Sequence, residues 1–387
     1  MEIILFQFYS PYPCPDYDEM GSYLTQQGHN VFVTHMTTDK KLLLSNKKNI
    51  TELDIFPWKI KNTKHFKFFA RRIAFIKFML RLRRIIKQIK PDIFMVATSE
   101  LMYLSMLPIF MPRHISFIYD VRQLGFNPGK SLKVKLKNIK AKINMWFISQ
   151  FIYDHSCFAF DNAAKLILGN NWISKKASVM EVGVNLNFLK APRSIKKTSH
   201  EKLQLVYIGS LAKVRKLEFI IDSVEQLITQ TKDFHVTFIG TDSENFYHSY
   251  LEKSKLQDYI TLLDPIPYKD VPITLNNYHA AIAYVPEHPD WHYQPTLKVK
   301  EYCALGMPIV ATDNMPNRVF VKENETGLFF QNTKEDFCNT ILTLINNEVL
   351  LNYLHANALK RRKGITWDDS ARNYETLFMN LKNQAKQ

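Results

Sequence analysis

The stretch PTLKVKEYCALGMPIVATD, residues Pro295 to Asp313, carries the pattern of a short helix, a glycine stop and a buried strand. Helical spacing covers Leu297 to Leu305, Gly306 ends the helix, and the apolar run Ile309 to Thr312 follows. Ligands of open α/β sheets bind outside the carboxyl ends of the strands. Glu301, an acid among apolar neighbours, is therefore the first candidate for a functional residue.

Strand-like and helix-like runs alternate along the whole chain, which predicts βαβ units around parallel sheets and an α/β fold. A chain of 387 residues is longer than the chains that usually fold around a single hydrophobic core. The polar run APRSIKKTSHE, residues 191–201, indicates a linker, and the alternation of strand-like and helix-like runs begins again after it. We therefore predict two Rossmann-like domains, residues 1–195 and 196–366, and a terminal helix, residues 367–387, that packs back on the first domain.

Composition narrows the class of protein. No run of about eighteen uncharged apolar residues occurs, and the N-terminus lacks the pattern of a signal peptide, so we expect a cytoplasmic protein. The four cysteines have no CxxC or CxxH spacing, which favours reduced thiols over disulfides or zinc. A net charge of +15 predicts an anionic partner: nucleic acid, an anionic membrane or a phosphorylated small molecule.

A second informative segment, Leu203 to Leu227, has the pattern of a strand, a basic loop and an amphipathic helix. The strand ends at Gly209, and Lys213, Arg215 and Lys216 lie in the loop. The N–H groups at a helix start, together with a basic side chain, form an anion site. A solvated basic loop without ligand explains the same pattern, and helical periodicity alone does not choose between them.

Taken together and in this order, the motifs resemble retaining glycosyltransferases of the GT-B fold, family 4 (glycosyl transferases group 1). In the second half they are YIGSLAKVR (207–215), FIGTD (238–242), DPIPYKDVP (264–272), AIAYVPE (281–287), the opening stretch and ENETGLFF (323–330). The first half adds QGHNVFV (27–33), KPDIFMVAT (90–98), IYDVRQL (118–124) and EVGVNLNFLKAP (181–192). The resemblance implies two Rossmann-like domains facing across a cleft, with a nucleotide sugar bound by the second.

The resemblance also implies roles for particular residues. Glu301 would accept hydrogen bonds from the ribose hydroxyls, while Arg215 and Lys298 would hold the donor diphosphate, with no metal and no cofactor. In the first domain, Arg122 corresponds to a donor-contacting residue at the cleft. The other expected donor-binding residues are Gly209, Ser210, Lys216, Gly240, Glu287, Tyr293, Thr296 and Leu297.

The chain departs from the family pattern at four places. The loop SPYPCPDY, residues 10–17, replaces the usual paired glycines, and Gln123 replaces an aspartate. Tyr293 occupies the position of the first glutamate of the usual pair, which leaves Glu301 alone, and Ser210 replaces a frequent arginine. The donor sugar is therefore less firmly assigned than the nucleotide.

Two rival motifs suggest metal chemistry. Residues 16–18 spell DxD, a metal and diphosphate motif of another glycosyltransferase fold, but acids beside proline in a first loop commonly cap a helix. Residues 287–292, EHPDWH, contain acids and histidines without the i, i+4 spacing of a helical metal site. We expect this segment to line the donor sugar instead, or to be a plain turn.

Two strongly basic stretches occur in the first domain. Residues 58–90 contain no acid, and ten Lys or Arg occur after Thr63, from Lys64 to Lys90, among apolar residues; a second cluster runs from Lys130 to Lys142. Some of the apolar side chains cover the sheet, but packing against a sheet does not explain why all the charged residues are positive. We predict peripheral attachment to the inner face of the cytoplasmic membrane. Nucleic acid is disfavoured, because no recognised nucleic-acid motif accompanies the charge.

The sequence thus predicts an enzyme that moves a hexose-type sugar, with retention, from a nucleotide-diphosphate sugar to a saccharide or lipid-linked acceptor. The expected pathways are bacterial capsule, O-antigen or exopolysaccharide synthesis. Two alternatives stay open: a nucleotide-sugar epimerase of the same fold, and a non-catalytic glycosyltransferase-like subunit.

Overall fold

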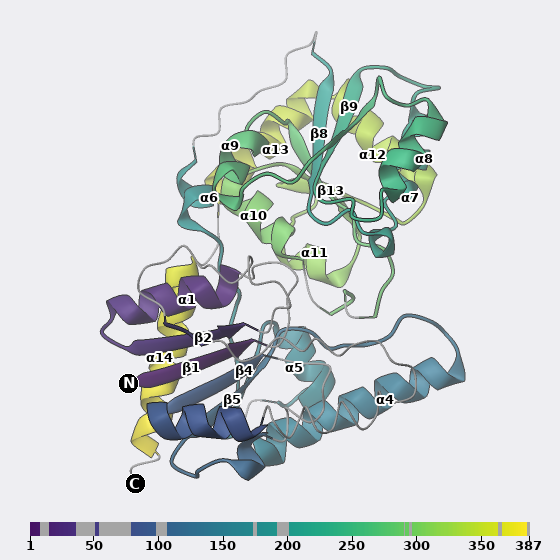
Figure 1. Ribbon diagram of the computed structural model, residues 1–387. Helices are drawn as coiled ribbons and strands as arrows, with labels where there is room; N and C mark the ends of the chain where they lie inside the picture. The colour runs from purple at the N-terminus through teal and green to yellow at the C-terminus, as the bar shows by residue number, and fades with distance from the viewer. Residues whose placement is uncertain are drawn as a thin grey trace. The chain divides into compact units, whose positions relative to one another are not determined.

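The computed structural model describes residues 1–7, 15–35, 51–53, 79–97, 107–172, 176–191, 201–289, 291–293, 296–362 and 366–384. The chain forms two compact units, each built around its own parallel sheet (Figure 1). Unit 1 comprises residues 1–183 and 365–387, and unit 2 comprises residues 184–364. The predicted α/β class with two Rossmann-like domains is confirmed.

Unit 1 contains a seven-stranded sheet with the order β3-β2-β1-β4-β5-β6-β7. Residues 79–89 are also helical. The named elements are β1 (Glu2–Gln7), α1 (Pro15–Gln26), β2 (Asn30–His35), β3 (Thr51–Leu53), β4 (Ile93–Ala97), the 3-10 helix η2 (Leu107–Phe110), β5 (Ser116–Val121), α4 (Leu132–Phe147), the π-helical turn η3 (Ile148–Ile152), β6 (His155–Phe158), α5 (Asp161–Leu168), β7 (Ala177–Val179) and α14 (Trp367–Gln384).

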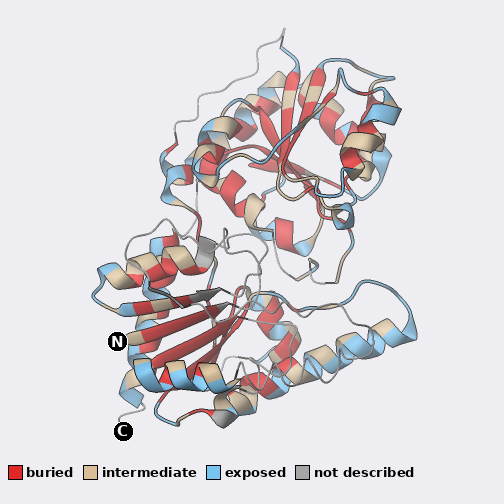
Figure 2. Cartoon of the chain, viewed as in Figure 1, coloured by how far each residue is buried: buried red, intermediate tan, exposed pale blue. Residues whose placement is uncertain are grey.

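The C-terminal helix α14 belongs to unit 1, where it lies beside α1 (Figure 1). Its apolar face, including Tyr374 and Phe378, packs with residues of α1, β1 and β4 in one buried cluster. Because side chains alternate along a strand, the other face of this sheet carries a different set, in which the rings of Phe94 and Phe117 lie 5.5 Å apart. Both faces of the sheet are therefore buried (Figure 2).

Unit 2 has a six-stranded parallel sheet with the order β10-β9-β8-β11-β12-β13. Its elements are α6 (Leu186–Lys190), β8 (Leu203–Ile208), η4 (Lys213–Arg215), α7 (Glu218–Leu227), β9 (Phe234–Ile239), α8 (Phe246–Ser254), β10 (Ile260–Leu263), η5 (Tyr268–Asp270), α9 (Val271–Leu275), β11 (Ala280–Ala283), α10 (Leu297–Leu305), β12 (Ile309–Thr312), α11 (Met315–Phe320), β13 (Gly327–Phe330), α12 (Lys334–Asn346) and α13 (Glu348–Lys360).

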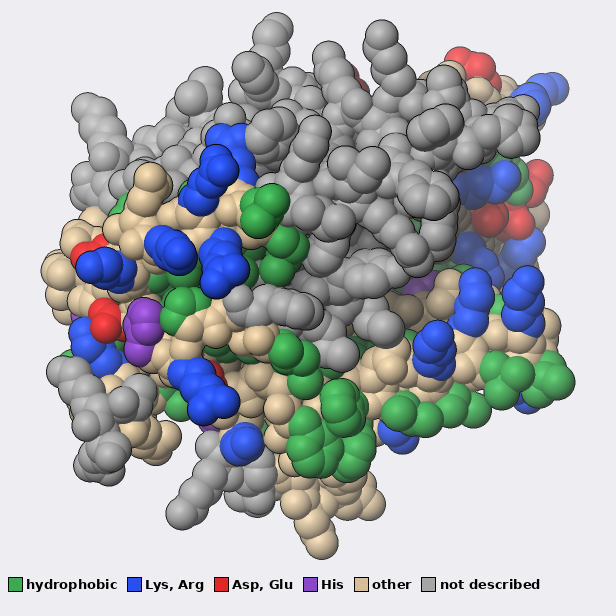
Figure 3. All heavy atoms as spheres, turned by 60° about the horizontal axis from the view of Figure 1, so that its bottom comes forward, with side chains coloured by type: hydrophobic (Ala, Val, Ile, Leu, Met, Phe, Trp, Pro, Cys, Tyr) green, Lys and Arg blue, Asp and Glu red, His purple; other side chains and the backbone are tan. Residues whose placement is uncertain are grey.

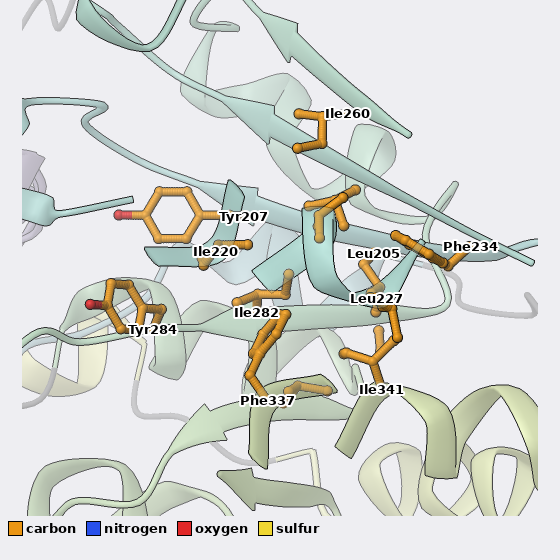
Figure 4. Close-up of a cluster of buried hydrophobic side chains, with 14 of the residues drawn as sticks. Leu205, Tyr207, Ile220, Leu227, Phe234, Ile260, Ile282, Tyr284, Phe337 and Ile341 are labelled. Carbon is orange, nitrogen blue, oxygen red and sulfur yellow. The ribbon is translucent and has the colours of Figure 1, made fainter. Parts of the chain in front are cut away.

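Two apolar clusters hold unit 2 together. One packs α7, α8, α12 and α13 on one face of the sheet, and the other packs α6, α9 and α10 on the opposite face. Figure 4 shows part of the first cluster, with the hydroxyls of Tyr207 and Tyr284 pointing the same way at one end of it. The glycine stop of the opening stretch is confirmed, since Gly306 ends α10 in the left-handed region with φ 74°.

The first domain boundary lies earlier than the predicted residue 195. Phe188 and Ala191 are buried in the core of unit 2, and the Arg362 guanidinium donates to their carbonyl oxygens at 3.0 and 2.7 Å. The segment from residue 184 to 191 is therefore part of unit 2. Residues 192–200 of the expected linker lie outside the described residues.

Other expectations also fall outside the described residues: most of the loop at 10–17, residues 58–78 of the first basic stretch, and Asp290. Short β3 is an element that the sequence did not predict. In the parts of the chain that the structure describes, no helix is both long and apolar enough to cross a bilayer. Cys157, Cys303 and Cys338 are free thiols.

Candidate functional site

The switch point of the unit 2 sheet lies between β8 and β11. From β8 the strand order runs to β9 and β10 on one side and to β11, β12 and β13 on the other. In doubly wound sheets, ligands bind at this point, outside the carboxyl ends of the strands. The residues that follow β8 and β11, together with α10, are therefore the ones to test as a site.

Two glycines allow the backbone to close tightly at this edge. A Cβ atom on Gly240 would lie 1.8 Å from the carbonyl oxygen of Gly209, so only glycine fits at the end of β9. Gly209 itself has φ 138°, and a Cβ there would lie 3.0 Å from Nζ of Lys298. The two predicted glycines and Lys298 thus come together at the end of β8.

Lys298 is held in an unusual electrostatic environment. Its Nζ lies 3.5 Å from the centroid of the Tyr207 ring, an attractive cation–π geometry. Burial and the neighbouring positive charge of Arg215 lower the pKa of Lys298 well below the usual 10.5, while Glu301 opposes this shift. A cation that has lost water and faces another cation gains much from an anionic ligand.

Arg215 is oriented by an aromatic ring from the loop after β11. Its guanidinium carbon lies 4.3 Å from the centroid of the Trp291 ring, which stacks in turn on His288 at 4.4 Å. The segment EHPDWH therefore reaches the basic loop after β8. This contact makes Trp291 a site residue, whereas the sequence identified only the segment that contains it.

Helix α10 is fixed against β8 by a buried hydrogen bond. The backbone N–H of Ile208 donates to the Tyr302 hydroxyl at 3.0 Å, and burial raises the pKa of Tyr302. Glu301, on the same helix, is buried with 7% of its surface exposed. Thr296 occupies the N-cap position of α10, but its buried hydroxyl has no hydrogen-bond partner among the described residues. This helix presents both Lys298 and the Thr296 hydroxyl.

The remaining predicted donor-binding residues are placed as follows. The Ser210 hydroxyl accepts a hydrogen bond from the Ala212 N–H at 3.2 Å, which shapes the turn after β8. Lys216 and Glu287 are exposed, whereas Tyr293 and Leu297 are half-buried. The contacts of these four residues with the donor stay predictions.

The start of α7 differs from the expected anion site. The Leu217 N–H donates to the Tyr247 hydroxyl at 2.9 Å, and that hydroxyl donates to the Glu218 carboxylate at 3.0 Å. An acid and a tyrosine of the protein thus already occupy this helix start. The positive groups available to an anion are instead the side chains of Lys298 and Arg215.

Arg122 lies in unit 1 within a buried polar cluster. Its Nε donates to Asp120 at 2.6 Å, and a terminal nitrogen donates to the Tyr374 hydroxyl at 3.1 Å. Asp120 is fully buried and also accepts from the hydroxyls of Tyr17 and Tyr374 at 2.8 and 3.0 Å. These bonds join α1, β5 and α14, which gives Arg122 a structural task. Its predicted contact with the donor stays a prediction.

The rival metal motifs gain no support from geometry. Residues 16–18, the DxD, lie at the start of α1, where acids commonly cap a helix. Within the described ranges, no three His, Cys, Asp or Glu side chains gather as a metal site. Independence from metal and from other cofactors stays a prediction.

Comparison with known proteins agrees with this geometry. Residues 190–361, which lie within unit 2, match the model of the family "Glycosyl transferases group 1". Unit 2 is therefore similar to the group 1 glycosyltransferases. A search of curated protein sequences finds no match.

Solved structures show the same fold over nearly the whole chain. Sucrose-phosphate synthase from Thermosynechococcus elongatus aligns with a TM-score of 0.72 at 14% identity, over 98% of this chain and 99% of that one. Anabaena Alr3699/HepE, solved with UDP, gives 0.70 at 11% identity, over 98% and 100%. The lipopolysaccharide outer core galactosyltransferase WaaB gives 0.65 at 15% identity, over 97% and 99%. The expected GT-B fold is confirmed.

Proposed function

We propose that the protein transfers a hexose-type sugar, with retention, from a nucleotide-diphosphate sugar to a lipid-linked saccharide during synthesis of a bacterial surface polysaccharide such as capsule or O-antigen. One observation carries the donor part: the cations Lys298 and Arg215 converge at the end of β8, and the buried acid Glu301 lies one turn along α10 from Lys298. In a nucleotide-diphosphate sugar, the diphosphate lies next to a ribose. The diphosphate matches the two cations, and the ribose hydroxyls match the acid.

Each of these side chains would act on a different part of the donor. The Glu301 carboxylate would accept hydrogen bonds from the two vicinal ribose hydroxyls. Lys298 and Arg215 would neutralise the charge that develops on the departing diphosphate, which favours the transition state over the bound donor. We assign no protein nucleophile, since the leaving diphosphate itself can take the proton of the attacking hydroxyl. Proteins of this fold have been solved with UDP or UDP-glucose, so UDP-sugars are the first donors to test.

The acceptor part of the proposal rests on unit 1. Its described basic residues include exposed Arg83, Arg84 and Lys87 on the helix at 79–89, and the exposed lysines of α4. A cationic face of this kind favours an anionic membrane surface, where a lipid-linked saccharide is found. Attachment to the inner face of the cytoplasmic membrane follows from this part of the proposal.

A transfer assay tests the proposal. Purified protein is incubated with a panel of labelled nucleotide sugars, with and without a bacterial lipid extract, and the anomeric configuration of the product is read by NMR. Label in lipid with retained configuration is the expected result. Turnover of the nucleotide sugar without acceptor would indicate an epimerase instead. Donor binding without any transfer would indicate a non-catalytic subunit.

A further inference from the structure

Helix α4 has two apolar faces, and only one of them is packed. Met145 of α4 and Ile148, the first residue of η3, face inward and are buried. The Asn138 side chain is bonded to the backbone of Asn127 at 2.8 and 3.0 Å. On the other side, six large apolar side chains are between 42% and 73% exposed: Leu132, Leu136, Ile139, Ile143, Trp146 and Phe147. We call these six residues the α4 stripe. Packing of α4 on unit 1 does not explain them.

The spacing of the α4 stripe places it on one line along the helix. From Leu132 to Ile143 its members follow one another at three or four residues, and Trp146 and Phe147 lie three and four residues beyond Ile143. This interval puts side chains on a single helical face. Figure 3 shows hydrophobic side chains in a row over α4, with Lys and Arg side chains beside it. An outward helix face in a soluble protein is normally polar, and an exposed apolar row marks an interaction site.

Lysines border the α4 stripe on both sides. With about 100° per residue, Lys135 and Lys142 fall on one side, and Lys133 and Lys140 on the other, each roughly 70–90° from its centre. All four are exposed, and the sequence contains no acid between Asp120 and Asp154. At the C-terminal end, the exposed Phe151 ring lies 5.6 Å from that of Trp146 and 5.2 Å from that of Phe147.

We propose that α4 docks on an anionic lipid bilayer, with its stripe inserted at the headgroup boundary and its flanking lysines on the lipid phosphates. Aliphatic residues between lysines, with Trp at one end, are the composition of a helix that lies in the membrane interface. Leu and Ile offer nothing to a nucleic acid, whose phosphates would bind lysines but whose bases stack on aromatic rings. The α4 stripe gives a location to the membrane contact of the proposed function. The biological purpose of this docking rests on that proposed function.

Insertion and charge attraction respond differently to salt. At about 1 M salt the screening length is about 3 Å, so attachment through lysines alone would be lost. Apolar burial is not screened. We therefore expect the full-length protein to sediment with vesicles of phosphatidylcholine and phosphatidylglycerol at low salt, and to remain partly bound at high salt.

The decisive comparison uses variants of exposed residues. A triple serine variant of the stripe should bind these vesicles at least tenfold more weakly and lose its salt-resistant fraction: Leu136→Ser, Ile139→Ser and Ile143→Ser. Each lysine changed to glutamine should cost about fivefold at low salt. The control Ile273→Ser with Val349→Ser, which removes exposed aliphatic side chains of unit 2, should bind as the parent does.

Fluorescence locates the helix. The emission of Trp146, obtained as the difference between the parent and Trp146→Phe, should shift to the blue with anionic vesicles. Vesicle binding by the stripe variant equal to the parent's, or no shift at Trp146, would overturn the proposal. So would a parent dimer that the serine changes convert to monomers, because the stripe would then bind a second copy. An unchanged circular dichroism spectrum and melting temperature of the stripe variant show that unit 1 is folded. Loss of sugar transfer with intact vesicle binding would count against the proposed function alone.

Discussion

The replacement of Lys298 by methionine should separate binding from stability in unit 2. Methionine keeps the length of the side chain but removes an ammonium that is buried, lies beside Arg215, and has a lowered pKa. Loss of one charge-assisted hydrogen bond to a diphosphate costs about 1.5–3 kcal/mol, so UDP affinity should fall roughly 10- to 150-fold. The same change should leave the melting temperature of the ligand-free protein unchanged or higher.

The expected gain in stability follows from the direction of the pKa shift. Between the lowered pKa of Lys298 and 10.5, the unfolded chain binds the proton that the folded chain has lost, so stability rises with pH there. Below that window the folded protein retains the full cost of the buried charge, which methionine removes. Isothermal calorimetry with UDP and thermal unfolding without ligand measure the two effects. The matched control is Lys213→Met, which replaces an exposed lysine of the loop after β8, with an expected change in affinity below about threefold. Equal UDP affinity of Lys298→Met and parent, or equal losses in both variants, would refute the reasoning.

Further predictions concern the same site and the core of unit 1. Because UDP should restore the charge of Lys298, its affinity should fall as pH rises through the lowered pKa, and calorimetry in buffers of different ionisation enthalpy should detect proton uptake. Glu301→Gln should reduce the preference for UDP over 2′,3′-dideoxy-UDP about tenfold in competition binding, and an unchanged preference would remove the ribose assignment. Trp291→Ala should weaken UDP binding about fivefold, whereas Trp291→Phe should retain most of it. Tyr374→Phe removes a donor to the buried Asp120 carboxylate and should lower the free energy of unfolding by about 1–3 kcal/mol, with UDP affinity unchanged.

The periodicity of the chain was enough to predict the sheets. Strand β12 begins and ends at the expected residues, because Ile309 to Thr312 is a continuous run of strand-forming residues between Pro308 and Asp313. Strand β3 was missed, since a three-residue edge strand has too few residues to show alternation. Local pattern therefore predicts the central strands better than the edges.

Fewer contacts of the candidate site could be predicted from the sequence. Lys298 and Gly209 could be placed at the switch point from their motifs, but the stacking of Trp291 on Arg215 depends on the path of a loop. The engagement of Arg122 with Asp120 and Tyr374 depends on where the terminal helix packs, 252 residues along the chain from Arg122 to Tyr374. Contacts of this kind follow from tertiary structure, which no local pattern contains.

Helix α4 shows a related limit. Its apolar residues occur on two faces, and a hydrophobic pattern does not say which of them meets the protein. The lysines predicted an anionic partner, while the exposed stripe became visible only once Met145 and Ile148 were seen to supply the inward contacts.

The central claim is that unit 2 binds a nucleotide-diphosphate sugar through Lys298, Arg215 and Glu301. Calorimetric titration of the full-length protein with UDP-, GDP-, TDP- and CMP-sugars, repeated with Lys298→Met and Glu301→Gln, tests it most directly. The account predicts saturable one-to-one binding of at least one diphosphate sugar, weakened by both substitutions. Absence of binding across the whole panel, or binding that neither substitution alters, would contradict it.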